Sequence, residues 1–137
     1  MKLPPRWAAV TFAAALAARV AFVFLADQPL LYTHQYHYFT NAQRLAEHPR
    51  PLAYIVTSDD WRTWNHHWTI APLYHLFAGL TLRLFGEHLL PLRLLQCVLD
   101  ALAAVAVAAL GRRAAGPRGG WAGLGYAFYW PAIGIGT

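Results

Sequence analysis

The chain has 137 residues, of which 58% are hydrophobic and only 12% are charged. Small soluble domains usually carry about 25% charged residues, and the apolar residues here form long runs, which excludes an ordinary soluble globule. The +5 formal charge does not indicate nucleic acid, because the basic residues flank apolar segments instead of forming a basic face. We therefore predict an all-α integral membrane protein with two to three transmembrane helices.

The first element is an apolar segment over residues 7–25, preceded by Lys2 and Arg6. A cleaved signal peptide has the same charge order. However, Arg19 interrupts the apolar region, and the following "FLADQP" is a poor cleavage site. We predict a retained transmembrane helix.

Residues 27–69 form the polar part of the chain, and residues 27–90 are predicted to be an outer loop with interfacial helices. Within it, Tyr38, Ala42 and Leu45 fall on one helical face, which is typical of a short helix lying in the membrane interface. Residues 70–85 are apolar but too few for a crossing, and Gly-Glu-His at 86–88 closes the segment.

A second transmembrane helix is predicted over residues 91–111, and residues 121–137 begin a further apolar segment. Between them lies a basic cluster of Arg112, Arg113 and Arg118. Positive residues mark the cytoplasmic side, so the N-terminus and the 111–120 loop are both expected inside. Two crossings then place residues 27–90 outside, in the periplasm of a multi-pass protein of the cell (inner) membrane.

Two charges lie inside the predicted crossings, Arg19 in the first and Asp100 in the second. Each is about 9–14 Å from the outer end of its helix, taking about 1.5 Å per residue. The similar depth allows an ion pair that aligns the two helices, which is the interpretation we favour. Alternatively, Asp100 shares a face with Arg93 and Gln96 and forms the wall of a polar cavity that opens outward.

The stretch "HQYHYFTNA", residues 34–42, lies just after the first crossing. It resembles the outer-loop pattern Asp-Glu-x-x-Tyr-x-x-x-Ala in the N-terminal part of the GT-C superfamily of membrane glycosyltransferases, especially the branch of dolichyl-phosphate-mannose protein mannosyltransferases (glycosyltransferase family 39). Tyr38 and Ala42 match, and Gln35 stands at the Glu position. His34 departs from the family, because it stands where the family has its catalytic Asp.

The stretch "HHWTIAPLYHLFAGLTLRLFGEHLLPLRLLQ" continues the resemblance. It has a proline- and aromatic-containing start, a short helix ending in Leu84-Phe85-Gly86, then Arg93 and a long apolar helix. The resemblance covers nearly the whole chain. Family members are several times longer, so we expect a fragment of a glycosyltransferase that is inactive by itself.

The resemblance implies sugar transfer from a polyprenyl-phosphate donor to an acceptor on the outer face. His34 can act as the general base, because histidine titrates near neutral pH, although it cannot offer the negative charge of an Asp. Asp59 and Asp60 can supply that carboxylate. In the alternative that we favour, Ser58 or Asp59 caps a short helix whose N-terminal end Asp60 stabilises.

Residues that could bind the substrate are chosen on two grounds. The arginines could bind the phosphate of the lipid donor, and the other residues lie in the matched motifs or in the same outer loop. The predicted substrate-binding residues are Gln35, Tyr38, Arg44, Arg62, His66, His67 and Arg93.

A metal site made of His34, His37, His66 and His67 is a second interpretation of the loop. We favour an interfacial belt in which these histidines lie beside Trp61, Trp64 and Trp68. We therefore assign no metal ligand or cofactor. A requirement for a divalent metal ion stays an open alternative.

Two rival functions stay open as well. One is a non-catalytic, truncated membrane protein that acts as a scaffold or partner, and the other is a metal-binding membrane protein of the outer face. The expected partners are the polyprenyl-phosphate sugar, membrane lipids, and either the rest of a longer polypeptide or a membrane partner, with no nucleic acid.

Overall fold

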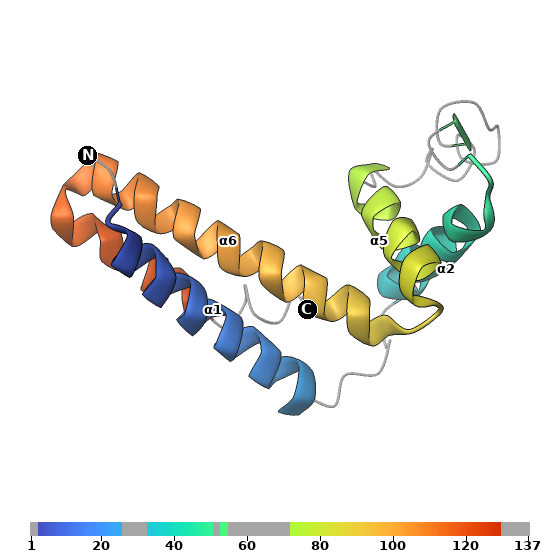
Figure 1. The fold of residues 1–137 in the computed structure, drawn as a ribbon, viewed down its shortest axis with the longest axis horizontal. Helices are drawn as coiled ribbons and strands as arrows, with labels where there is room; N and C mark the ends of the chain where they lie inside the picture. Colours follow the sequence, from blue (N-terminus) through green and yellow to red (C-terminus); the bar gives the residue numbers. More distant parts are fainter. Residues whose placement is uncertain (1–2, 26–32, 51–52, 55–71, 130–137) are drawn as a thin grey trace. The chain divides into compact units, whose positions relative to one another are not determined.

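The computed structural model of the chain describes residues 3–25, 33–50, 53–54 and 72–129. Their regular structure is entirely helical, with no strand in these ranges, so the predicted all-α class is confirmed. The helices belong to two compact units. Unit 1 holds α1, η1, α7 and α6 from Arg93 onward, whereas unit 2 holds α2, α5 and the first residues of α6 (Figure 1).

Two helices among the described residues are long and apolar enough to cross a membrane, α1 (Pro5–Leu25) in unit 1 and α6 (Leu89–Ala115), most of which belongs to unit 1. They have 21 and 27 residues, which corresponds to about 32 and 40 Å at about 1.5 Å per residue. A bilayer core is about 30 Å thick. Both helices extend slightly beyond the predicted ranges 7–25 and 91–111.

After α6 the chain turns through the short 3₁₀ helix η1 (Pro117–Gly120) and enters α7 (Trp121–Ala127), which packs on α1. Gly123 makes this approach possible, because a Cβ there would lie 2.7 Å from the Ala104 carbonyl oxygen and 3.0 Å from Thr11 Cγ2. The apolar segment predicted over 121–137 therefore begins with a helix of seven residues, and its last part, 130–137, lies outside the described residues.

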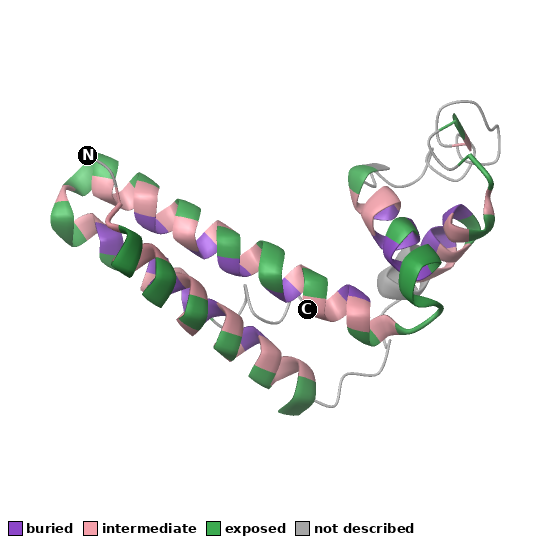
Figure 2. Ribbon diagram, viewed as in Figure 1, coloured by how far each residue is buried: buried purple, intermediate pink, exposed green. Residues whose placement is uncertain are grey.

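The core of unit 1 consists of small side chains. Ala15, Ala101, Ala104 and Ala127 are fully buried and form one cluster. Figure 2 shows exposed positions along both long helices. The large exposed apolar residues of α1 and α6 in this unit are Val10, Phe24, Leu25, Leu95, Val98, Leu99, Leu102 and Leu110. Small residues inside and large apolar residues outside are typical of helices that pack within lipid.

Unit 2 is built on the contact between α2 (Thr33–Glu47) and α5 (Pro72–Phe85). Ala42 and Leu45 are buried, so these two positions of the predicted apolar face are confirmed. Gly79 of α5 fits closely against them, because a Cβ there would lie 2.9 Å from Leu45 Cβ and 3.1 Å from the Ala42 carbonyl oxygen. The two helices are thus locked together by a small residue at their crossing.

The opposite face of α5 is apolar and exposed. Leu73, Leu80 and Leu84 lie at helical spacing and are 77%, 49% and 76% exposed. The helix has 14 residues, or about 21 Å, which is too short to cross a bilayer core of about 30 Å. Its length therefore agrees with the expectation that this segment does not span.

Candidate functional site

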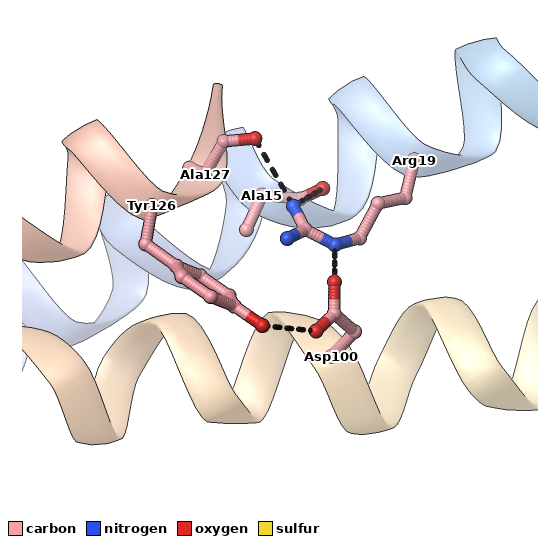
Figure 3. Close-up of polar contacts among 5 residues, drawn as sticks. All are labelled: Ala15, Arg19, Asp100, Tyr126 and Ala127. Carbon is pink, nitrogen blue, oxygen red and sulfur yellow. Dashed lines mark hydrogen bonds and ion pairs between the residues drawn. The ribbon is translucent and has the colours of Figure 1, made fainter. Parts of the chain in front are cut away.

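A buried ion pair lies in the middle of unit 1. Arg19 of α1 has no exposed surface, and its Nε donates to Oδ2 of Asp100 on α6 (Figure 3). The pairing predicted from the depth of the two residues is confirmed. Because the Arg19 side chain is completely covered, it joins the helices and does not line an open cavity.

The C-terminal end of α7 completes the coordination of both charges. Arg19 Nη1 donates to the carbonyl oxygens of Ala15, at 3.2 Å, and of Ala127, at 3.1 Å. Ala127 is the last residue of α7, so its carbonyl oxygen is one that the helix itself leaves without a donor. The negative end of the α7 dipole thus faces a guanidinium, which is a favourable arrangement.

Tyr126 contacts both members of the pair. Its hydroxyl donates to Asp100 Oδ1 at 2.7 Å, and the Arg19 guanidinium carbon lies 5.4 Å from the centre of its ring. Both oxygens of the Asp100 carboxylate therefore accept a hydrogen bond, one from α1 and one from α7 (Figure 3). A cation above an aromatic face at this distance is also attracted to it. Three helices are held by one cluster of polar groups.

Small residues next to the pair let the helices approach. Thr11, Ala15 and Arg19 follow one face of α1 at intervals of four residues, and all three are buried. On α6, Cys97 and Ala101 are fully buried on the turns beside Asp100. Larger side chains at these positions would separate the helix backbones and lengthen the Arg19–Asp100 contact.

Two polar atoms in this region have no hydrogen-bond partner among the described residues. They are Nη2 of Arg19 and Oγ1 of Thr11, both buried. An unsatisfied donor in a buried site destabilises the fold by about 1–3 kcal/mol. The cluster is therefore not a fully satisfied network, even though both charges are neutralised.

Chemically, the cluster is a structural connection and not a reaction centre. The Arg19 charge is covered, and the Asp100 side chain is only 15% exposed. A carboxylate that accepts two hydrogen bonds and faces a guanidinium is held in position. Removing either partner would leave an unpaired buried charge, which costs about 3–5 kcal/mol in comparable sites.

The residues predicted for catalysis and substrate binding are only partly described. His34, Gln35 and Tyr38 lie in the first turns of α2, where the structure describes the backbone. Arg44 is exposed in the last turn of the same helix, and Arg93 is half-buried near the start of α6. Both of these arginines interact with another group. The other candidates lie outside the described residues; they are Asp59, Asp60, Arg62, His66 and His67.

No group of three or more His, Cys, Asp or Glu side chains that could hold a metal occurs in the part of the chain that the structure describes. The predicted four-histidine alternative depends on side chains outside that part, so it stays a hypothesis.

Sequence reasoning found Arg19 and Asp100 and missed the contribution of α7. Tyr126 lies in an apolar segment and gives no charge signal, and Ala127 contributes only a backbone carbonyl. The one available signal was the hydroxyl of Tyr126, a polar group that needs a partner in an apolar environment.

Comparison with protein-family models, curated proteins and solved structures finds no match for this chain.

Proposed function

We propose that the chain is a membrane segment that crosses the bilayer with α1 and α6 and carries unit 2 on the outer face. The length of the two helices supports this, as does a core of alanines surrounded by exposed large apolar side chains. The buried Arg19–Asp100 pair also suits this environment, because a charge within a crossing needs a partner inside the protein.

We further propose that unit 2 takes part in sugar transfer from a polyprenyl-phosphate donor, as the GT-C resemblance implies. The observation that carries the proposal is that two matched motifs belong to one packed unit. The Tyr-x-x-x-Ala frame lies on α2 with Ala42 buried against α5, and the Leu-Phe-Gly motif ends α5. The packing of α2 on α5 would hold the first turns of α2 steady next to a substrate.

In this proposal, His34 accepts a proton from the acceptor hydroxyl as that oxygen attacks the anomeric carbon of the donor sugar. The bond from the sugar to the phosphate then breaks, and the polyprenyl phosphate leaves. Arg44 is exposed at the far end of α2 and is a candidate for binding the phosphate, since a guanidinium forms charge-assisted hydrogen bonds with it.

The test is photo-crosslinking of the full chain in nanodiscs with a polyprenyl-phosphate hexose that carries a diazirine near its phosphate. We expect adducts within residues 33–69, competed by the unmodified lipid and reduced several-fold in Arg44→Gln. The control is Arg83→Gln, because Arg83 is exposed in the same unit and carries the same charge.

Adducts that unmodified polyprenyl-phosphate hexose does not compete, or that lie only in α1 and α6, would contradict the transferase proposal. In that case a non-catalytic scaffold becomes the better account of the chain, while the proposed membrane insertion is unaffected.

A further inference from the structure

The net charge of the chain comes from two segments of the sequence, residues 1–26 and 101–137. The chain has 11 basic and 6 acidic residues. Residues 1–26 and 101–137 contain no acidic residue, and their bases, apart from the paired Arg19, are Lys2, Arg6, Arg112, Arg113 and Arg118. The remaining six basic residues balance the six acidic ones, so these five account for the entire +5 charge.

Contacts within unit 1 bring the basic segments together. The rings of Trp7 and Trp121 meet edge to face with centroids 4.9 Å apart, which joins the start of α1 to the start of α7. Gly120, just before Trp121, is buried on the Arg112 side chain, because a Cβ there would lie 3.1 Å from Arg112 Cγ. Arg6, next to Trp7, therefore lies at the same end as the loop that follows α6.

Arg112 differs from its basic neighbours because it is partly enclosed. Its aliphatic stem packs on Gly120, and its Nε is a buried donor with no hydrogen-bond partner among the described residues. Arg6, Arg113 and Arg118 are exposed. The site thus combines one guanidinium whose stem is packed with several exposed charges, and residues 1–26 and 101–137 contain no carboxylate side chain.

We infer that this end of unit 1 binds the phosphate headgroup of an anionic phospholipid. A phosphodiester accepts paired hydrogen bonds from a guanidinium, and Arg112 is held in place here by the packing of its stem on Gly120. The neighbouring surface is apolar and suits acyl chains, since Leu110 and Trp121 are 62% and 60% exposed. Tryptophan at the headgroup level is typical of membrane proteins, and basic pockets between helices at the cytoplasmic side bind anionic headgroups.

The inference rests on the membrane insertion proposed above, but not on sugar transfer. Positive residues near membrane helices also set the orientation of a protein in the membrane. A headgroup site differs from that general effect, because one ligand binds to defined residues. A charge effect alone would treat the five basic residues as equivalent. In a site formed by packed side chains, lipid binding instead depends more strongly on Arg112 than on the other basic residues. It also depends on Gly120, an uncharged residue on which the Arg112 side chain packs.

The experiment uses the full chain in nanodiscs of equal phosphatidylglycerol and phosphatidylcholine, and native mass spectrometry counts the lipids retained after release. We expect retained phosphatidylglycerol to exceed phosphatidylcholine. Arg112→Gln should lower its retention by about fivefold or more, the effect of about one basic residue near a headgroup. Arg83→Gln, with the same charge change in unit 2, should match the wild type.

Gly120→Ala tests the packed stem directly, because the added Cβ would lie 3.1 Å from Arg112 Cγ and crowd that side chain without changing any charge. We expect it to lower phosphatidylglycerol retention at least threefold while helix content, measured by circular dichroism, stays unchanged. If either Gly120→Ala or Arg112→Gln retains phosphatidylglycerol like the wild type, the inference is wrong. Displacement of the lipid by millimolar inorganic phosphate would also overturn it, because the site would then be one for free anions.

Failure to insert into nanodiscs at all would refute the proposed membrane insertion, and this inference with it. Normal insertion without phosphatidylglycerol selectivity would overturn the lipid site alone.

Discussion

Arg19 is a charged residue in the middle of an apolar helix, and its surroundings in unit 1 determine what it does. Asp100 neutralises it, and the end of α7 supplies a carbonyl oxygen and the Tyr126 hydroxyl. The effect of replacing such a pair on stability depends on whether one or both residues are replaced. The complete pair adds little relative to an apolar replacement of both residues, but a single replacement leaves an unpaired buried charge.

We predict that Arg19→Met and Asp100→Leu each lower the free energy of unfolding by about 3–5 kcal/mol, because each leaves its partner unpaired. The double variant should recover most of this loss, since it removes both charges together. A double-mutant cycle from detergent unfolding, followed by circular dichroism, measures the coupling. Additive losses would show that the two side chains do not act as a pair.

The Tyr126 hydroxyl can be tested separately from its ring. Tyr126→Phe keeps the ring beside Arg19 and removes the hydrogen bond to Asp100. We expect a loss of about 1.5–3 kcal/mol, typical of a hydrogen bond to a charged group. Tyr129→Phe is the matched control, because Tyr129 is 58% exposed, and it should lie within about 0.5 kcal/mol of the wild type. Equal effects of both variants would contradict the assigned role.

At the scale of elements, the close packing of α7 depends on a missing side chain. Gly123 lies against α1 and α6, whereas a Cβ on Gly125 of the same helix would meet no atom within 4 Å. The two glycines therefore differ in environment although they are two residues apart on one short helix.

We predict opposite effects for the two alanine substitutions in α7. Gly123→Ala should lower the free energy of unfolding by about 1–3 kcal/mol, because its Cβ overlaps neighbouring backbone. Gly125→Ala should be neutral or raise it by up to about 1 kcal/mol, the difference in helix propensity. Unfolding in detergent measures both. A stable Gly123→Ala protein would mean that α7 does not pack as described.

The exposed leucines of α5 allow a test of whether this helix lies in the membrane interface. If α5 lies in the membrane interface, a spin label at Leu80→Cys in a Cys97→Ser background should be more accessible to oxygen than to a water-soluble nickel chelate. A label at Glu87→Cys, in the exposed segment after α5, should show the reverse. Equal preference for the nickel chelate at both positions would place α5 in water.

The long helices could be predicted from sequence because the length of an apolar run is a local property. Residues 7–25 and 91–111 lie inside α1 and α6, and the ends differ by only a few residues. The Arg19–Asp100 pair was predictable too, because helix rise converts residue number into depth. The role of α7 was not predictable in this way. It depends on how η1 turns the chain after α6, and no charge marks Tyr126 as a partner.

On the scale of the whole molecule, the proposed functions depend on which side of the membrane each unit faces. The basic end of unit 1 is expected inside, and α1 and α6 are both long enough to cross. In the proposed topology unit 2 would lie outside, where a polyprenyl-phosphate sugar and its acceptor would meet. The sugar-transfer proposal for unit 2 requires this orientation, whereas the lipid site at the basic end requires only membrane insertion.

The measurement that tests this account most directly is the accessibility of single cysteines in intact cells. In a Cys97→Ser background, we expect Glu87→Cys to react with a membrane-impermeant maleimide from outside. We expect Ala114→Cys, exposed at the end of α6, to react only after the membrane is permeabilised. This result would support two crossings with unit 2 outside. Reaction of both cysteines from outside, or of neither, would contradict it.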